Sequence, residues 1–344
     1  MTEGYGRWTA RLIAAVAAAL SLVEAFNFFM DPYQLFRADD IYINCSERRG
    51  NFGLAAYHSP DGIIVGNSLV ENFSPAYTAR VMGGKAAKLA ISGGTAREQR
   101  LIAQAALESG RIRYAIICLD VRSFTSPAGS VTPGAPLYFY ERDTVKKWEG
   151  IIPDALLSYD TLLLSAKKAM LKYFGVNSWK FVRDLEKNYV DEHPENFGEA
   201  GVMKSLAKSR PSFVKLADAL ADDLPGMEES FDKNFAELPE RFPGTAFHFY
   251  FPPYSYMFYR EIEGYSGRGY ANLAAFKGHV RGRLATCGNA RLYDFQAYTA
   301  ISGDLRNYKD ATHYSAGVAR RIIDGMHDGG ATALPAPASA PPGR

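Results

Sequence analysis

Short apolar runs typical of buried strands alternate with helical patterns over much of this chain. Three such runs cover residues 62–65, 87–91 and 114–119, and two more cover 246–251 and 291–295. The helical pattern after the second run opens with Thr95-Ala96-Arg97-Glu98, a capping box. Strands and helices in alternation favour a parallel sheet with helices on both faces. The pattern therefore predicts an α/β fold.

The stretch from about 140 to 240 has a different character. Lys, Glu, Asp and Ala become more frequent there, and apolar residues recur at helical spacing, as in Leu162-Leu163-Leu164. We expect a helical insertion in the α/β domain. It could form a lid or a wall over a ligand crevice, or it could be a solvated appendage.

The N-terminus carries the longest apolar segment. Residues 12–23 are uninterrupted except for one Ser, and apolar residues resume after Glu24 as far as Met30. With Arg7 and Arg11 ahead of it, this segment predicts a membrane anchor over residues 1–30 whose N-terminus lies in the cytoplasm. A secretory signal cleaved near Ala17-Ala18-Ala19 is the alternative. Either reading exports the rest of the chain.

The rest of the chain is predicted to form one domain and a C-terminal tail. We expect one large domain over 31–330, with the helical insertion inside it. From Gly329 the chain becomes rich in Ala, Pro and Gly, which predicts a disordered tail over 331–344.

Composition and residue spacing argue against several classes of function. The 344 residues are 47% hydrophobic and 22% charged, and the formal net charge of +2 comes from Lys and Arg spread along the chain. A nucleic-acid partner is therefore not expected. No His or Cys spacing suits a metal site, and no glycine fingerprint for a nucleotide is present. We expect neither a metal nor a cofactor.

Candidate chemistry lies at the ends of the predicted strands. Ser68, Gly93 and Asp120 each follow a strand, and ligand crevices in parallel sheets form beyond the carboxyl ends of the strands. Ser68 needs a base to act as a nucleophile, and His313 with Asp310 three residues earlier could supply a base and its orienting carboxylate. The amides of Ser68 and Gly93 could then stabilise an oxyanion.

Each motif also has an ordinary structural explanation. Ser68 could simply cap the helix that follows it. Ser315 could likewise cap the last helix, with Asp310 and His313 as a surface pair. The order of the motifs and their positions at strand ends favour a catalytic triad over these separate explanations.

Three blocks together resemble the SGNH/GDSL hydrolase family. Gly66-Asn67-Ser68 is similar to the first block, Ile91-Ser92-Gly93-Gly94 to the second, and Asp310-Ala311-Thr312-His313 to the DxxH of the last. The apolar N-terminus followed by Asp31-Pro32-Tyr33 resembles a branch of single-span, envelope-facing members, the DltD-like and alginate-acetylation-type proteins. The resemblance covers roughly 31–125 and 245–327, and it implies a flavodoxin-like sheet.

The sequence departs from the family pattern in three places. Asn67 stands where the family usually has Asp, and Leu69 stands where the branch often has Arg. Asp120 stands where the third block supplies an Asn as oxyanion donor, and an ionised Asp120 would repel an oxyanion. Arg122 or another group could replace that donor, or only two donors operate.

The resemblance implies a serine esterase or O-acyltransferase that uses Ser68, His313 and Asp310. Its expected substrates are acyl esters, with acetyl preferred, of a cell-envelope or exported polysaccharide. The expected location is the bacterial inner membrane, with a single span and the catalytic domain in the periplasm. The alternative is a non-catalytic envelope protein of the same fold that binds polysaccharide or partners a multi-span membrane acyltransferase.

Overall fold

The computed structural model describes residues 2–43, 46–176, 194–297 and 299–328. The tail predicted to be disordered, 331–344, lies outside these residues. The chain forms two compact units. The first comprises residues 1–58 and 134–184, and the second comprises residues 59–133 and 185–344.

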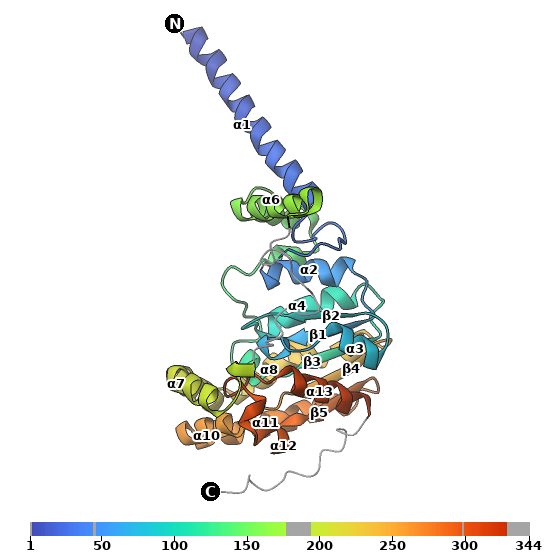
Figure 1. Cartoon of the computed structure of the whole chain (residues 1–344), viewed down its shortest axis with the longest axis vertical. Helices are drawn as coiled ribbons and strands as arrows, with labels where there is room; N and C mark the ends of the chain where they lie inside the picture. Colours follow the sequence, from blue (N-terminus) through green and yellow to red (C-terminus); the bar gives the residue numbers. More distant parts are fainter. Residues whose placement is uncertain (1, 44–45, 177–193, 298, 329–344) are drawn as a thin grey trace. The chain divides into compact units, whose positions relative to one another are not determined.

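The second unit is built on a five-stranded parallel sheet with the order β2-β1-β3-β4-β5 (Figure 1). Its strands are β1 (Gly62–Gly66), β2 (Ala86–Ala90), β3 (Tyr114–Cys118), β4 (Ala246–Phe251) and β5 (Ala290–Asp294). All five predicted strands are present. The structure thus confirms an α/β fold with a parallel sheet.

Helices cover both faces of this sheet. The helices of this unit are α3 (Pro75–Met82), α4 (Ala96–Leu107), α7 (Glu199–Asp222), α8 (Leu224–Phe231), α9 (Leu238–Arg241), α10 (Tyr256–Tyr265), α11 (Gly267–Leu284), α12 (Thr299–Ser302) and α13 (Ala316–His327). Helices α3 and α13 pack on each other, whereas α4, α8 and α11 form a second group. Connections between parallel strands are almost always right-handed. The chain moves from β1 to β2 in one direction and then back past β1 to β3, so α3 and α4 lie on opposite faces of the sheet. A ligand crevice is expected where the order reverses, beside the ends of β1 and β3.

The sheet is the core of this unit. Ile63, Ile64 and Val65 of β1 are completely buried, as are Ala115, Ile116 and Ile117 of β3. Central strands of a covered parallel sheet are apolar on both sides, which explains why these runs do not alternate. Gly66 ends β1 where its neighbours pack closely: a Cβ there would lie 2.7 Å from Val70 and 2.8 Å from Cys118. The absence of a side chain lets Val70 and Cys118 pack against the end of β1.

Local signals in the sequence correspond to real helix ends. Thr95 and Glu98 form the predicted capping box at the start of α4. Ser315 caps α13 by accepting from the Val318 amide. The helix expected near 270–284 is α11, but α10, directly before it, was not predicted.

The first unit is helical. It consists of α1 (Thr2–Met30), α2 (Glu47–Tyr57), α5 (Thr144–Ile151) and α6 (Tyr159–Phe174). The predicted insertion at 140–240 is thus divided, because α5 and α6 belong to this unit while α7, α8 and α9 belong to the other.

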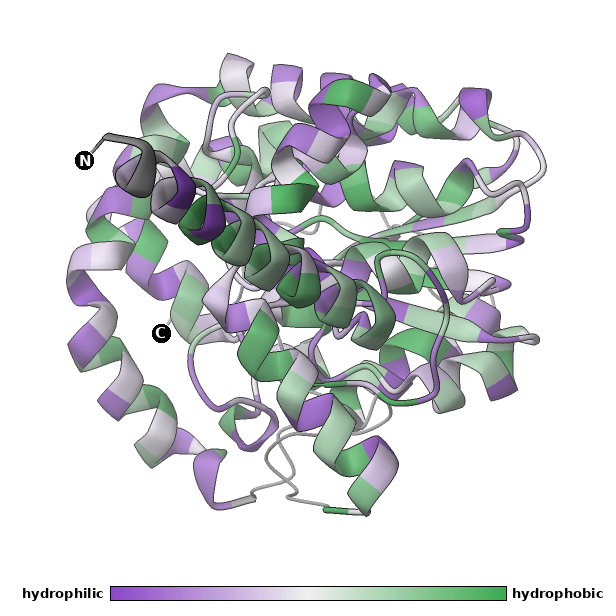
Figure 2. Ribbon diagram, turned by 90° about the horizontal axis from the view of Figure 1, so that it is seen from above, coloured by the Kyte–Doolittle hydropathy of each residue, from purple (hydrophilic) through white to green (hydrophobic). Residues whose placement is uncertain are grey.

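Helix α1 is long and apolar enough to cross a membrane over Tyr5–Met30. At 1.5 Å per residue, those 26 residues span about 39 Å, more than the roughly 30 Å hydrocarbon core of a bilayer. Figure 2 shows apolar colouring along most of α1. Most of its side chains are exposed.

Candidate active site

Ser68 lies in the turn directly after β1. Asn67 caps the short 3-10 helix η1 (Ser68–Val70), and its side-chain oxygen accepts from the Leu69 amide at 3.1 Å. Because Ser68 is the first residue of this helix, its own amide has no acceptor inside the helix. The turn therefore presents both the hydroxyl and the amide of Ser68 at the end of the sheet.

Asp310 and His313 lie in the loop before α13. A β-bridge between Tyr308 and Tyr314 closes this loop. Inside it, Oδ1 of Asp310 accepts from the amides of Thr312 and His313, each at 2.8 Å. The other oxygen, Oδ2, lies 2.7 Å from Nδ1 of His313. The Asp310 carboxylate therefore orients both the loop and the imidazole ring.

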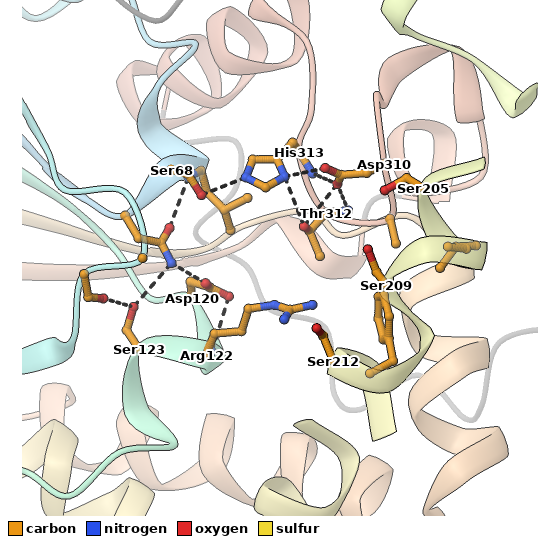
Figure 3. Close-up of a pocket in the computed structure, with 17 residues that line it drawn as sticks. Ser68, Asp120, Arg122, Ser123, Ser205, Ser209, Ser212, Asp310, Thr312 and His313 are labelled. Atoms are coloured by element: carbon orange, nitrogen blue, oxygen red, sulfur yellow. Dashed lines mark hydrogen bonds and ion pairs between the residues drawn. The ribbon is translucent and has the colours of Figure 1, made fainter. Parts of the chain in front are cut away.

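His313 connects this loop to Ser68. Its Nε2 lies 2.7 Å from Oγ of Ser68, as Figure 3 shows. A carboxylate can only accept, so Nδ1 donates to Asp310 and Nε2 is left to accept from the serine hydroxyl. Ser68, His313 and Asp310 thus form a continuous hydrogen-bonded chain across 245 residues of sequence. This is the arrangement in which a histidine removes a serine proton.

Asp310 is ionised in this setting. Burial alone would raise the pKa of Asp310, but the hydrogen bond and charge of His313 and the two backbone amides hold that pKa well below its usual range. A negative Asp310 would stabilise an imidazolium at His313 if that ring took a proton.

Two backbone amides are available to bind an oxygen near Ser68. Gly93 adopts φ +63°, and the following residue, Gly94, donates to the Ile91 carbonyl at 2.7 Å. In the described part of the chain, the amides of Ser68 and Gly93 have no acceptor, and both residues line the same pocket. They satisfy the requirement for oxyanion donors that are not already occupied.

Asp120 is engaged with donors at the base of the pocket. Its carboxylate accepts from Nδ2 of Asn67 and from the hydroxyl of Tyr254. Tyr254 in turn accepts from the Val121 amide at 3.1 Å. Asp120 and Asn67 are both buried, so two of the three departures from the family pattern form a hydrogen-bonded pair. These donors compensate the buried carboxylate.

A second network holds the glycine loop in place. Nε2 of Gln99 donates to Oγ of Ser123 at 2.8 Å and to the Gly94 carbonyl at 3.1 Å. Ser123 also donates to the Gly94 carbonyl at 3.1 Å. Sequence reasoning did not identify Gln99 or Ser123, since each is one polar residue on an ordinary helical segment. Together they tie the second block to the end of β3.

Arg122 reaches into the pocket. Its guanidinium lies 5.3 Å from the centre of the Phe213 ring, and no ion pair involves it in the part of the chain that the structure describes. Figure 3 shows the side chain extending toward Ser209 and Ser212. A guanidinium without a carboxylate partner can donate to a ligand oxygen.

Helix α7 supplies one wall of this pocket, which has a volume of about 290 Å³. The wall consists of Ser205, Leu206, Ser209, Ser212 and Phe213. Among the described residues, the three serine hydroxyls make no hydrogen bond to protein. Sequence reasoning missed this wall, although the serine spacing of four and three residues places all three on one helical face.

The pocket brings together every residue that the sequence singled out: Asn67, Ser68, Gly93, Asp120, Arg122, Asp310 and His313. Among the residues described, no group of three or more His, Cys, Asp or Glu side chains could hold a metal ion. No protein-family model matches the chain, and comparison with curated proteins gives no match.

Proposed function

We propose that this chain is a membrane-anchored, SGNH-type serine esterase or O-acyltransferase. Its proposed substrates are acyl esters, with acetyl preferred, of a cell-envelope or exported polysaccharide. The observation that carries the proposal is the hydrogen-bonded chain from Ser68 through His313 to Asp310, with both links at 2.7 Å. The hydroxyl-lined wall of α7 supports a carbohydrate ligand, because its free hydroxyls can bond to sugar hydroxyls.

The first half-reaction follows from this geometry. Oγ of Ser68 attacks the acyl carbonyl while Nε2 of His313 takes the hydroxyl proton. The carbonyl oxygen becomes an oxyanion that the amides of Ser68 and Gly93 bind. The bond to the leaving alkoxide then breaks, and His313 returns the proton to that oxygen. An acyl-Ser68 ester remains.

The second half-reaction depends on the acceptor. His313 removes a proton from water or from a sugar hydroxyl, whose oxygen attacks the acyl-Ser68 carbonyl. Collapse of the intermediate restores Ser68, which regains its proton from His313. Water as acceptor makes the protein an esterase, whereas a sugar hydroxyl makes it an O-acyltransferase. Arg122 is the proposed third donor to the oxyanion, in place of the family's Asn.

The location follows from α1. Arg7 and Arg11 precede the apolar stretch, so the positive-inside rule retains the N-terminus in the cytoplasm. We therefore place the catalytic unit in the periplasm, on a single span of the bacterial inner membrane. Exported polysaccharide would be accessible there.

A fluorophosphonate probe tests the nucleophile directly in the full chain. We expect the wild-type protein to be labelled at Ser68, and labelling to disappear in Ser68→Ala and His313→Ala. Ser209→Ala is the matched control, because it removes another hydroxyl from the same pocket and should leave labelling intact. Folding of each variant is checked by circular dichroism.

A folded wild-type protein that resists the probe would contradict the proposal, as would equal labelling of Ser68→Ala. The non-catalytic alternative, an envelope protein that binds polysaccharide or partners a multi-span acyltransferase, would then be favoured. Asp120, which stands where the family has a neutral donor, is the feature consistent with that alternative.

A further inference from the structure

Helix α6 has its polar residues inside and its apolar residues outside. Its buried positions are Thr161, Ser165 and Lys168, each no more than 1% exposed. The opposite stripe contains large apolar side chains that are exposed: Tyr159, Leu163, Met170, Tyr173 and Phe174. A helix on the surface of a soluble domain has the reverse pattern.

Two of the three buried polar residues are hydrogen-bonded, whereas the Ser165 hydroxyl has no partner among the described residues. The Lys168 ammonium donates to the Asp31 carbonyl at 3.0 Å and forms an ion pair with Asp39 at 3.1 Å. Thr161 donates to the Asp154 carbonyl at 3.3 Å. Since Asp31 directly follows α1, these bonds hold α6 against the end of the apolar helix. Figure 1 shows α6 crossing that end of α1.

An aromatic cluster lies at the same end of α1. The ring of Phe28 lies 4.8 Å from that of Phe36, and Phe36 stacks on Trp148 of α5 at 5.9 Å. Arg37 lies over Phe28 at 4.9 Å and donates to its carbonyl. Aromatic rings and cations gathered at the end of an apolar helix are typical of the boundary between a bilayer and water.

Exposed apolar side chains are concentrated in this part of the chain. Among the described residues, ten large exposed ones lie between Leu137 and Val176, whereas the whole second unit has four. Scattered exposed apolar residues are ordinary, but a dense group indicates a binding surface.

We propose that α6 and the C-terminal half of α5, which carries Trp148, lie in the headgroup region of the bilayer that α1 crosses. The bilayer is the occupant favoured by continuity, because the exposed stripe begins where the apolar helix ends. The inference rests on the proposed membrane anchor, and it adds that the first unit is a membrane-surface platform and not only a tether.

Tryptophan quenching by brominated lipids tests this in the full chain, reconstituted into nanodiscs of phosphatidylcholine and phosphatidylglycerol. The three native tryptophans, Trp8, Trp148 and Trp179, are changed to Phe. Single tryptophans are then introduced as Phe174→Trp on α6, Leu20→Trp within α1, and Tyr265→Trp as the matched control on the second unit. Tyr265 is chosen because it is also an exposed aromatic residue at the end of a helix.

We expect lipid brominated near the headgroup end of the acyl chain to quench the tryptophan at 174 at least about twofold more than that at 265. Quenching at 20 but equal quenching at 174 and 265 would overturn the inference while leaving the anchor intact. Quenching at none of the three would remove the anchor as well. A tryptophan at 174 shielded from both lipid bromine and aqueous acrylamide would show that protein covers α6, which also contradicts the inference.

Discussion

At the residue scale, the site depends on how Asp310 divides its two oxygens. One oxygen accepts from two backbone amides, and the other accepts from the His313 ring. The first set of bonds shapes the loop, and the second selects the ring tautomer that can accept from Ser68. A single carboxylate therefore couples the local fold to the chemistry.

Asp310→Asn should preserve the loop but disrupt the hydrogen-bonded chain from Asp310 through His313 to Ser68. An amide is nearly isosteric with a carboxylate, so its oxygen can still accept from the backbone amides, but its NH₂ group favours the wrong imidazole tautomer. We expect the second-order rate constant for probe labelling to fall by about 10²-fold to 10⁴-fold. Asp304→Asn is the control, because it makes the same substitution at a carboxylate in an exposed ion pair with Arg306. An unchanged rate in Asp310→Asn would show that Asp310 has no part in activating Ser68.

His248 makes a separate prediction about stability. It is buried in β4, with its Nδ1 3.0 Å from the Tyr293 hydroxyl. Burial, aided by the charge of Arg291, lowers the pKa of His248 to about 4. The unfolded chain binds a proton at this histidine below about pH 6.5, whereas the folded chain does not until about pH 4.

The free energy of unfolding should therefore fall as the pH drops from about 6.5 toward 4, with His248 accounting for at most about 3 kcal/mol. His248→Phe should flatten this dependence in urea titrations made between pH 7 and pH 4.5. The exposed His327→Gln should leave it as in the wild type. A pH dependence unaltered in His248→Phe would mean that another group causes it.

At the element scale, the pocket is assembled by strand ends on one side and by α7 on the other. The ends of β1 and β3 and the loop after β2 supply Ser68, Asp120 and Gly93. Helix α7 supplies no titratable group to the pocket, only hydroxyls and apolar contact. The strand ends are thus suited to the proposed reaction, and α7 is suited to binding the proposed substrate.

The serine face of α7 should affect binding more than chemistry. Changing Ser205, Ser209 and Ser212 together to Ala would remove three hydroxyls, each worth about 0.5–1.5 kcal/mol when bonded. We expect KM for an acetylated oligosaccharide to rise about 10-fold or more, with little change in kcat or in labelling by a small fluorophosphonate. Lys208→Ala, on the exposed side of the same helix, is the control. Equal loss of kcat and labelling would instead indicate a structural role.

At the scale of the whole molecule, the chain combines a unit that we propose is catalytic with a unit that we propose faces the membrane. The second unit carries the sheet and the pocket. The first unit carries α1 and most of the large exposed apolar residues outside α1. Residues 134–184 belong to the first unit although they interrupt the second unit in sequence.

Membrane attachment through α1 is testable by fractionation. The full chain should resist carbonate extraction, dissolve only in detergent and retain residues 1–30 by intact mass. Val16→Arg with Leu20→Arg should shift it to the soluble fraction, since each arginine near the centre of a span costs about 2.5–3.5 kcal/mol. Met203→Arg with Tyr256→Arg, two exposed positions on the second unit, controls for a nonspecific effect of added charge. A membrane-free protein that begins after Ala19 would support the cleaved signal.

Patterns within a few residues were enough to predict the strands, the capping box, the apolar N-terminal helix and the candidate residues at strand ends. Each depends on local periodicity or on a short side-chain-to-backbone bond, which neighbouring residues determine. The three short blocks that resemble a known family also singled out Ser68, Gly93 and His313, and the structure brings these residues together in one pocket.

Other features depended on residues far apart in sequence, and only the tertiary structure decided them. Ser68 and His313 meet across 245 positions, and Asn67 pairs with Asp120 across 53. The division of 140–240 between two units, the serine wall of α7 and the outward apolar stripe of α6 are equally non-local. Helical periodicity shows that a stripe exists, but the direction in which it points is determined by what packs against the helix. For α6 that partner is the buried pairing of Lys168 with Asp31 and Asp39.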